Sequence, residues 1–363
     1  MDEPAVGTGR GHAPGAGRPY GSAMLAAVID PTRQSLDIVE MPDPVCGPGD
    51  LLVAVRAAGL NRADLAVRAG GYVVGTSRTA AAGAAVAPAI AGAELAGEVV
   101  AVGREVTGWQ VGDAVMAQGR GYAELAVVDA ALAMPKPTSL SWEEAGGLPV
   151  ALLTMHDALV TNGRWQEGDT VAVHAATSGV GVIGLQLALH LGAPRVFGVS
   201  RSPAKWPTLE AALGNAHHGR DIVDRVVLVA PGELAERSAA LTADRGVDVV
   251  IDNVGAATLE DSLAAAAIRG RIVQVGRLGG RHAQLDLDEL ARKRVSLIGV
   301  TFRTRTRAER LAVVEAARRD LGTALEAGVL RPVVHRVYPL HEALAAQDDL
   351  ARNDHVGKLV LRP

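Results

Sequence analysis

The sequence lacks the residues that several kinds of functional site require. It contains one cysteine, Cys46, in 363 residues, which excludes an internal disulfide and a cysteine-rich zinc site. Aromatic residues make up 3% of the chain, and basic and acidic residues number 36 and 40. Neither stacking rings nor a basic face is therefore available for nucleic acid or an anionic membrane. Because no apolar run is long enough to span a membrane, we expect a soluble cytoplasmic protein.

The length suits two domains of ordinary size, preceded by a short extension. Residues 1–23 are rich in Gly, Pro and Ala and lack the apolar segment of a signal peptide, so we expect a flexible extension. The first strand is expected at residues 24–29. Residues 78–91 are also of low complexity and are expected to form a loop insertion.

Two patterns divide the remaining sequence. Between residues 24 and 134, short apolar strands alternate with Gly, Pro and Asp, which indicates a β-rich, barrel-like domain. Between residues 152 and 300, apolar strands alternate with helices, which predicts an α/β fold with a doubly wound parallel sheet. The expected strands of this sheet are 171–174, 195–199, 226–229, 247–252, 271–275 and 296–301. A helix at 308–327 and strands near 333–337 and at 358–361 are expected to return to the first domain.

The most informative segment is a nucleotide-binding turn within residues 170–190. A buried strand runs into small residues, so no side chain obstructs a ligand there, and an apolar helix follows. The free N–H groups and the positive end of such a helix favour a pyrophosphate. Ser178 stands where the usual second glycine of the dinucleotide fingerprint would be. The predicted cofactor-binding residues of the turn are Ala176, Thr177, Ser178, Gly179, Val180 and Gly181.

The end of the second strand indicates which dinucleotide is bound. Enzymes that use NAD place an acid there for the ribose 2′-hydroxyl, but here no acid occurs before Glu210. Arg201 and Lys205 can pair with a 2′-phosphate, and Ser200 can donate a hydrogen bond, which favours NADPH. In the plainer alternative, Ser202 and the proline after it only start a helix, with Arg201 solvated beside them.

Segments along the chain from about Met24 to the C-terminus resemble the medium-chain dehydrogenase/reductases. They resemble in particular the zinc-free quinone oxidoreductase branch, which includes zeta-crystallin-like and p53-inducible quinone-reductase-like proteins. The matching segments are AAGLNRADLAVRAGGY (57–72), AGAELAGEVVAVGREVTGWQVGDAVMA (91–117), LPVALLTMHDAL (148–159), VHAATSGVGVIGLQLAL (173–189), VDVVIDNVG (247–255), GRIVQVG (270–276), SLIGVTFRTRT (296–306) and VGKLVL (356–361). The resemblance implies a GroES-like catalytic domain of residues 24–150 and 303–363, and a Rossmann NADP-binding domain of residues 151–302.

Metal-using members of this family hold a catalytic zinc with two cysteines and a histidine. At the three matching positions this sequence has Asn61, Ala93 and Val150. Since alanine and valine offer no lone pair, the three protein ligands that a catalytic zinc needs are absent, and we expect no metal.

The resemblance also assigns residues to the cofactor. Members of the family place the residues that match Thr154, Asn253, Gly276, Phe302 and Arg303 around the nicotinamide, its ribose and its carboxamide. Lys358 matches a basic residue near the pyrophosphate. For Thr154, with apolar neighbours on both sides, a buried hydroxyl that bonds within its helix is an equally open alternative.

Two residues are candidates for the substrate. Asn61 replaces the first zinc ligand and by resemblance lies over the nicotinamide, so its amide can hold a quinone or enone oxygen. Tyr72 matches the tyrosine of quinone reductases and the proposed proton donor of related enoyl-thioester reductases, and it is the best candidate acid; an aromatic lid is the alternative. Asp64 is expected to be structural, and His156 and His174 to be satisfied core residues.

The expected function is zinc-independent, NADPH-dependent reduction of a small-molecule substrate, either a quinone or an α,β-unsaturated carbonyl compound. The alternatives are an enoyl-thioester reductase and, from another class, a non-catalytic NADPH-binding protein like some zeta-crystallin relatives. We also expect a homodimer. The apolar strand at 296–301 would otherwise leave an open sheet edge, and in relatives the corresponding strand pairs with its copy in a second subunit across a two-fold axis.

Overall fold

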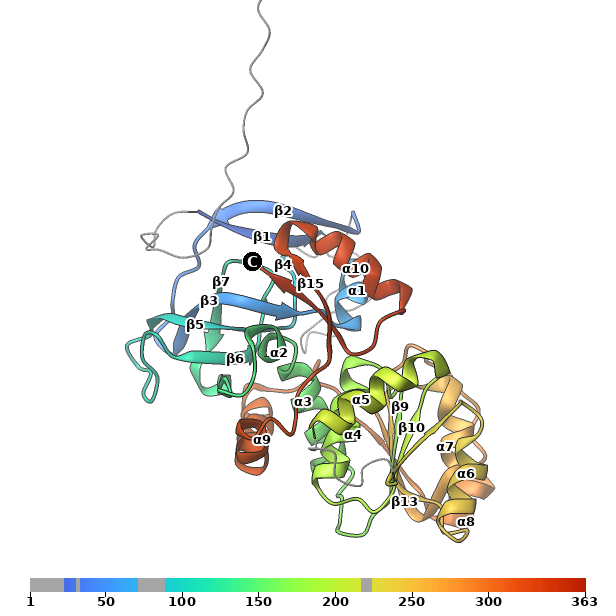
Figure 1. Ribbon diagram of the computed structural model, residues 1–363. Coiled ribbons are helices and arrows are strands. Elements are labelled where there is room, and N and C mark those ends of the chain that lie inside the picture. Colours follow the sequence, from blue (N-terminus) through green and yellow to red (C-terminus); the bar gives the residue numbers. More distant parts are fainter. Residues whose placement is uncertain (1–22, 31–32, 71–88, 217–223) are drawn as a thin grey trace, which may run out of the picture.

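The computed structural model describes residues 23–30, 33–70, 89–216 and 224–363, which form two lobes joined along one side (Figure 1). Tyr72, most of the expected extension and most of the expected loop insertion lie outside the described residues. The expectation of a loop over 78–91 was wrong at its end, because residues 89–90 form a short strand that pairs with the first strand. None of the described helices is long and apolar enough to cross a membrane.

The first lobe consists of two sheets that close on one another. The larger has the order β15-β16-β3-β5-β6-β8, with β7 also paired to β3, and the smaller has the order β2-β1-β4. The backbone N–H of Ala27 donates to the carbonyl of Tyr122 (2.8 Å), which joins the two sheets. The strands are β1 (Ala23–Asp30), β2 (Ser35–Pro42), β3 (Asp50–Gly59), β4 (Ala89–Ile90), β5 (Glu94–Val102), β6 (Ala114–Gln118), β7 (Leu125–Asp129), β8 (Met134–Pro135), β15 (Val334–Pro339) and β16 (Lys358–Arg362).

The second lobe is a six-stranded parallel sheet of order β11-β10-β9-β12-β13-β14. Helices cover both faces, with α4 and α5 on one side and α6, α7 and α8 on the other (Figure 1). The chain order reverses beside β9, where ligands of such sheets bind. The strands are β9 (Val171–His174), β10 (Val196–Val199), β11 (Val226–Val229), β12 (Val247–Asp252), β13 (Ala266–Gln274) and β14 (Ser296–Gly299). The helices are α4 (Gly179–His190), α5 (Trp206–Ala216), α6 (Leu234–Leu241), α7 (Leu259–Ala265) and α8 (Leu287–Lys293).

Buried apolar strands explain why the sheet forms. All four residues of β9 and all four of β10 are buried, as a parallel sheet covered on both faces requires. The expected strand at 296–301 was too long, because β14 ends at Gly299 and the chain then leaves the sheet. The expected strand at 271–275 was too short, since β13 begins at Ala266, directly after α7.

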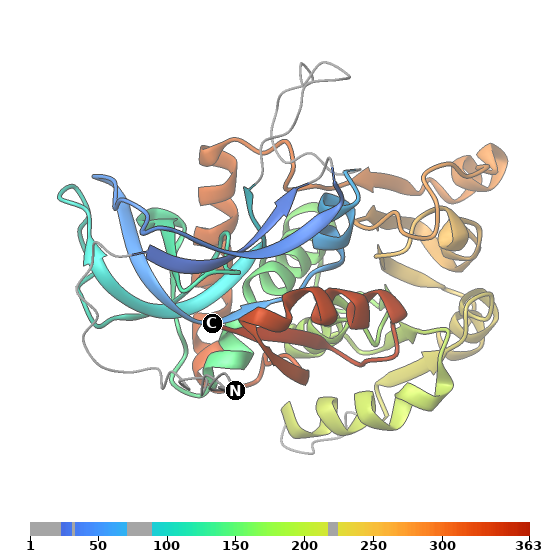
Figure 2. The same ribbon diagram turned by 90° about the horizontal axis from the view of Figure 1, so that it is seen from above.

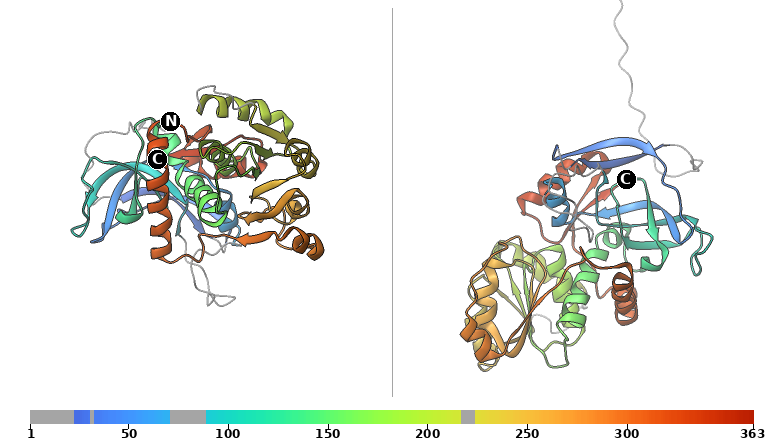
Figure 3. Two further views of the ribbon diagram at one scale, coloured as in Figure 1. Left: turned by 90° about the horizontal axis from the view of Figure 1, so that it is seen from below. Right: turned by 180° about the vertical axis from the view of Figure 1, so that it is seen from behind.

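The remaining helices lie in the first lobe or between the lobes. They are α1 (Arg62–Arg68), α2 (Trp142–Gly146), α3 (Pro149–His156), α9 (Arg307–Glu326) and α10 (Ala343–Arg352). A π-helix, Asp157–Asn162, continues α3. Seen from above, α10 lies along the side of the first lobe that faces the second (Figure 2), and α9 stands beside α3 (Figure 3).

One hydrophobic core runs through both lobes. It includes Met116 of the large sheet, Leu152 and Leu153 of α3, Val173 of β9 and Leu321 of α9. Because α3 is buried against both lobes, it fixes the position of the nucleotide-binding sheet relative to the first lobe. The strands β15 and β16 come after this sheet in the chain and pair within the first lobe, as the sequence indicated.

Candidate active site

The turn between β9 and α4 has the shape that the sequence predicts for a nucleotide phosphate site. Ala175 adopts a left-handed conformation (φ 54°) and ends the strand. A side chain at Gly181 would place its Cβ 2.1 Å from the Ala175 carbonyl oxygen, so the backbones approach too closely for any other residue. Ser178 is the N-cap of α4, and its Oγ accepts the Gly181 N–H (3.1 Å). The serine therefore satisfies one free amide of the helix end, which explains its place in the motif.

The end of β10 lies beside this turn. The hydroxyls of Thr177 and Ser200 are 3.3 Å apart and share a hydrogen bond, and both side chains are buried. Arg201 follows on the surface. Lys205, half-buried, donates to the backbone carbonyl of Asn353, the residue that ends α10 in the first lobe. Ser200, Arg201 and Lys205 therefore lie where the adenosine ribose of a dinucleotide is expected.

Positive charge accumulates at this place from both lobes. Arg62, at the start of α1, donates to the side-chain oxygen of Asn353. Burial and the nearby Arg201 lower the pKa of Arg62, and burial lowers the pKa of Lys205. Burial and the charges of Arg62 and Lys205 lower the pKa of His355 to about 4. Among the described residues, no ion pair joins a carboxylate to Arg62, Arg201 or Lys205, although the charge of Asp354 also acts on Lys205. These three side chains form a cation cluster that is suited to an anion.

The opposite side of the turn is formed by β12 and the loop after β13. The Asn253 amide nitrogen donates to the His174 carbonyl (3.0 Å), while its Oδ1 is buried without a partner among the described residues. A Cβ at Gly276 would lie 1.9 Å from the Asn253 carbonyl oxygen. Only glycine permits this approach. The Asn253 Oδ1 is left as a buried acceptor that a ribose hydroxyl could use.

A buried polar triad joins the first lobe to the turn. Asn61 Nδ2 donates to Glu94 Oε1 (2.9 Å), and its Oδ1 accepts from Lys358 Nζ (2.8 Å). Lys358 also pairs with Glu94 and donates to the Leu60 carbonyl (3.1 Å), and both charged side chains are buried. The Lys358 methylenes lie against Gly179, where an added Cβ would be 2.6 Å from Cδ. Lys358 therefore lies between the phosphate turn and Asn61, with its ammonium bound on the Asn61 side.

The three positions of the zinc ligands meet around Glu94. Asn61 contacts this carboxylate through its amide, Val150 donates its backbone N–H to Glu94 Oε2 (2.7 Å), and Ala93 is the neighbouring residue. Among the described residues, no group of three or more histidine, cysteine, aspartate or glutamate side chains is arranged to hold a metal. Glu94 is central here but was missed in the sequence. An acidic residue at the head of an apolar strand was the signal that could have found it.

Asp64 supports Asn61 from the other side. Its Oδ2 accepts the Asn61 backbone N–H (2.8 Å) and the Tyr122 hydroxyl (2.8 Å), which agrees with the structural role expected for it. Burial raises the pKa of Asp64 to about 6, although these two hydrogen bonds and the charge of Lys358 oppose the rise. The pKa of Tyr122 is raised well above its usual value by burial and by the Asp64 charge, so its hydroxyl stays protonated.

The remaining predicted residues lie on two segments. Thr154 is in α3, and Phe302 and Arg303 follow β14. Thr154 is half-buried, whereas the residues around it in α3 are buried. Phe302 packs on the common core just after β14, and the backbone N–H of Arg303 donates to Thr301 Oγ1 (3.2 Å). The histidines expected in the core are buried and hydrogen-bonded through Nε2, His156 to Asp320 and His174 to Ser262 (2.9 Å each).

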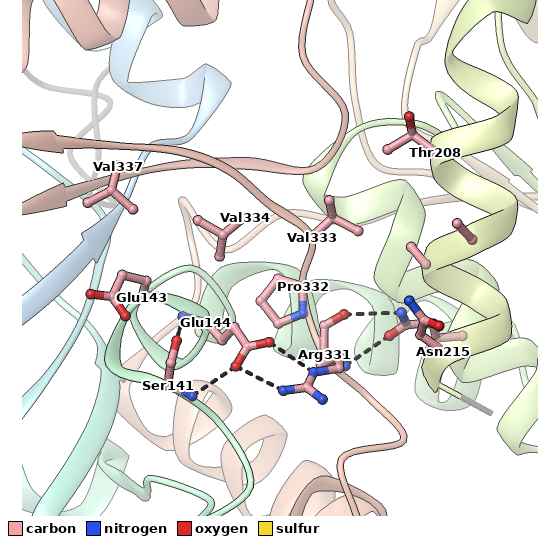
Figure 4. A pocket seen from close by; sticks show the side chains of 13 residues that line it. Ser141, Glu143, Glu144, Thr208, Asn215, Arg331, Pro332, Val333, Val334 and Val337 are labelled. Atoms are coloured by element: carbon pink, nitrogen blue, oxygen red, sulfur yellow. Dashed lines mark hydrogen bonds and ion pairs between the residues drawn. The ribbon is translucent and has the colours of Figure 1, made fainter. Parts of the chain in front are cut away.

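A separate groove of about 670 Å³ lies between the lobes near α2, α5 and residues 331–337 (Figure 4). Arg331 crosses its floor to Glu144, with Nε donating over 2.9 Å. None of the sequence-predicted site residues lines this groove. It is distinct from the site formed around the glycine turn.

Comparison with known proteins identifies the family. Residues 47–138 match the alcohol dehydrogenase GroES-like domain, and residues 179–317 match the zinc-binding dehydrogenase family. The solved structure of a mycobacterial quinone oxidoreductase is 31% identical, over 94% of this chain and 100% of that chain, with a TM-score of 0.77. The chain belongs to the medium-chain dehydrogenase/reductase superfamily. The expected fold, a Rossmann domain with a GroES-like domain, and the likeness to the quinone oxidoreductase branch are thus confirmed.

Other members of the superfamily show the range of its chemistry. A mycobacterial relative whose structure contains NADPH is 31% identical over 94% of this chain and 100% of that chain, with a TM-score of 0.77. The CurK enoyl reductase is 26% identical, over 94% of this chain and 98% of that chain, with a TM-score of 0.74. The spectinabilin polyketide synthase protein NorB of Streptomyces orinoci is 33% identical over 90% of this chain, and the mycoketide-CoA synthase of Mycobacterium tuberculosis is 30% identical over 90%. This chain spans only 14% and 7% of the length of those two synthases.

Proposed function

We propose that this medium-chain dehydrogenase/reductase is a zinc-independent, NADPH-dependent oxidoreductase that reduces a quinone or an α,β-unsaturated carbonyl compound. The observation that carries the proposal is the meeting of the β9–α4 turn with the cation cluster. The turn presents backbone N–H groups at a helix N-terminus, which favours a pyrophosphate. The cluster presents Arg62, Arg201 and Lys205 without carboxylate partners at the end of β10, where a 2′-phosphate fits and an NAD enzyme would have an acid.

The residues of the site fit this cofactor. NADPH, when bound, supplies the hydride, and the protein has to bind it, orient it and exclude competing reactions. The turn and the cluster would hold its phosphates, and the unpartnered Asn253 oxygen would accept a ribose hydroxyl. Thr154, Gly276, Phe302 and Arg303 remain the proposed neighbours of the nicotinamide. Lys358 would act indirectly, since its ammonium is already bound by Glu94 and Asn61.

Asn61 is proposed to hold a substrate oxygen, but its amide already has hydrogen-bond partners within the protein. Both polar atoms of its amide are engaged, one with Glu94 and one with Lys358. The second N–H of Nδ2 has only a long contact with the Gly59 carbonyl (3.4 Å), so that hydrogen is the one available to a substrate oxygen. The fixed Lys358 charge on Oδ1 would make this N–H a stronger donor. Tyr72 remains the proposed proton donor.

An enoyl-thioester reductase is the second candidate, and a specific observation favours it. The sequence relatives include modular polyketide synthases, and CurK is an enoyl reductase with the same fold over 94% of this chain. Reduction of an enoyl thioester would use the same hydride and the same cofactor residues. It differs in requiring a proton at carbon and room for a thioester arm.

Self-association is also proposed. β14 is the edge strand of the second lobe's sheet, and Leu297 within it is 44% exposed. Leu278 and Leu287, from the segment just before this strand, are exposed as well. An apolar, unpaired edge of this kind is protected when it pairs with a second copy across a two-fold axis. The single cysteine and the balanced charge fit an enzyme of the cytoplasm.

The decisive experiment is oxidation of NADPH by the purified protein with a panel of quinones, enones and enoyl thioesters. We expect turnover with at least one class and a preference for NADPH over NADH. Preference for enoyl thioesters would select the second candidate. Tight NADPH binding without turnover of any class would indicate a non-catalytic NADPH-binding protein.

A further inference from the structure

A partly buried ion pair outside the cofactor-binding residues ties together the two elements that carry Thr154 and Phe302. The Asp157 side chain is 1% exposed, and its Oδ2 accepts from Arg305 Nη2 (2.6 Å). The other carboxylate oxygen is buried and has no partner among the described residues. Burial raises the pKa of Asp157, while the charge of Arg305 opposes the rise. Such a pair adds little net stability, because the cost of desolvating the charges offsets their attraction.

Arg305 holds the segment that crosses between the lobes after β14. Its Nε donates to the Thr301 carbonyl (3.1 Å), and its guanidinium carbon lies 4.9 Å from the centroid of the Phe302 ring. One side chain thus fixes both the backbone before Phe302 and the face of its ring. A flat guanidinium can do this, because it donates in its plane and stacks above it.

Asp157 anchors this arrangement to α3. It is the first residue of the π-helix that continues α3, and it follows Thr154 by three residues, which is about one helical turn. The wider π-turn changes the direction of the side chains that follow α3, and such turns are frequent at functional sites. The Asn162 side chain donates to the Asp157 carbonyl (2.9 Å) and stabilises the turn from within.

We propose that Asp157 and Arg305 are positioning residues that hold the Phe302 segment at a fixed place against α3. The inference rests on the proposed function, in which Thr154 and Phe302 both border the nicotinamide. The pair then sets the width of the space between these two elements. The phosphates of the cofactor would be held elsewhere, by the β9–α4 turn and the cation cluster, so the pair should affect hydride transfer more than binding.

The test compares Arg305→Met and Asp157→Asn with the wild type. We expect kcat to fall roughly tenfold to a hundredfold for Arg305→Met and less for Asp157→Asn, since small misplacement of reacting atoms has effects of this size. The dissociation constant of NADPH should change by less than about threefold. The primary isotope effect on turnover with NADPH deuterated at the transferred position should rise, because hydride transfer becomes slower relative to the other steps. Arg305→Lys keeps the charge but loses the fork and the stacking, and should recover only part of kcat.

Asp129→Asn is the matched control. Its partner Arg307 comes two residues after Arg305, at the start of α9, and the Arg307 side chain is exposed, so loss of this ion pair should leave kcat and the isotope effect unchanged. Lower melting temperatures for Asp157→Asn and Arg305→Met with unchanged kcat and isotope effect would overturn the proposal, because they would show a structural role alone.

A readout without turnover separates this inference from the proposed function. If the wild type binds NADPH but reduces no substrate, the proposed function fails, and the fluorescence anisotropy of the bound nicotinamide still tests the pair. Lower anisotropy in Arg305→Met than in the wild type, with both proteins saturated, would support the positioning role. Equal anisotropy would contradict it.

Discussion

Replacing Asp64 with Asn should change how the stability of the protein depends on pH. Asp64 lies beneath Asn61, and burial raises its pKa from 3.8 to about 6. The folded chain therefore retains this proton up to about pH 6, while the unfolded chain releases it near its ordinary value. Between these values the folded state binds more protons than the unfolded state, so stability falls as pH rises. The penalty is absent well below pH 4, grows between about pH 4 and pH 6, and is complete above about pH 7.

The structure sets the size of the effect. A shift of about two pKa units corresponds to about 3 kcal/mol, because each unit is equivalent to 1.36 kcal/mol. Both hydrogen bonds to Asp64, from the Asn61 backbone and the Tyr122 hydroxyl, reach the same oxygen. An asparagine oxygen at this place can accept both, so Asp64→Asn removes the charge and keeps the contacts.

The assay is denaturant unfolding of the wild type and of Asp64→Asn across about pH 4 to 8. The free energy of unfolding of the variant, relative to the wild type, should grow by about 3 kcal/mol over this interval. Asp113→Asn, at a half-buried carboxylate in the same lobe that also accepts a backbone N–H, is the control for loss of a carboxylate. A constant difference between Asp64→Asn and the wild type would refute the assignment of a raised pKa to Asp64.

Five further outcomes are expected. Arg201→Ala should weaken NADPH binding by a factor that corresponds to roughly 1.5–3 kcal/mol and leave NADH binding almost unchanged. Arg62→Ala should also weaken NADPH binding selectively. Arg68→Ala is its control, because it removes another contact between α1 and α10 but should not change NADPH binding. Equal weakening of NADPH and NADH binding would contradict the assignment of Arg201 and Arg62 to the 2′-phosphate. Elemental analysis should find no stoichiometric zinc, and about one tightly held zinc per chain would overturn that expectation. Light scattering should show a dimer that Leu297→Lys weakens, and a wild-type monomer at micromolar concentration would refute it. Tyr72→Phe should lower activity toward enoyl thioesters by about a hundredfold but toward quinones only a few fold, with NADPH binding intact; a large loss with quinones would contradict the proposed roles.

Local sequence patterns predicted most of the second lobe. The strands at 171–174, 226–229 and 247–252 were placed with the bounds that the structure shows, because continuous apolar runs between turn residues leave little freedom. The ends of β13 and β14 were placed less well. Where a strand ends depends on its neighbour in the sheet: β14 stops at Gly299, paired with Gln274 at the end of β13. Strand β4 was missed because its two residues have no periodicity of their own.

The residues of the candidate site also differ in how far local sequence could predict them. The glycine turn, Ser200 and Arg201 lie within one strand–helix–strand unit, so spacing along the chain was sufficient to propose them as cofactor-binding residues. Arg62 and His355 join them only through tertiary contacts with the start of α1 and the end of α10, and no local pattern marks either residue. Ser178 departed from the glycine fingerprint, and the structure gives the reason: its hydroxyl caps the helix that the motif begins.

The proposed cofactor and substrate sides of this site are connected through the Lys358 side chain. The Lys358 methylenes fill the space beside Gly179, and the backbone of Gly357 donates to the Thr177 carbonyl (2.8 Å), so the C-terminal strand is tied directly to the phosphate turn. The same side chain ends at Glu94 and Asn61. Movement of the turn would therefore shift Asn61, because a buried charge cannot leave its partners without a cost of several kcal/mol. At the position where metal-using relatives have a zinc ligand, a fixed ammonium, held by a carboxylate, would keep the amide of Asn61 in place.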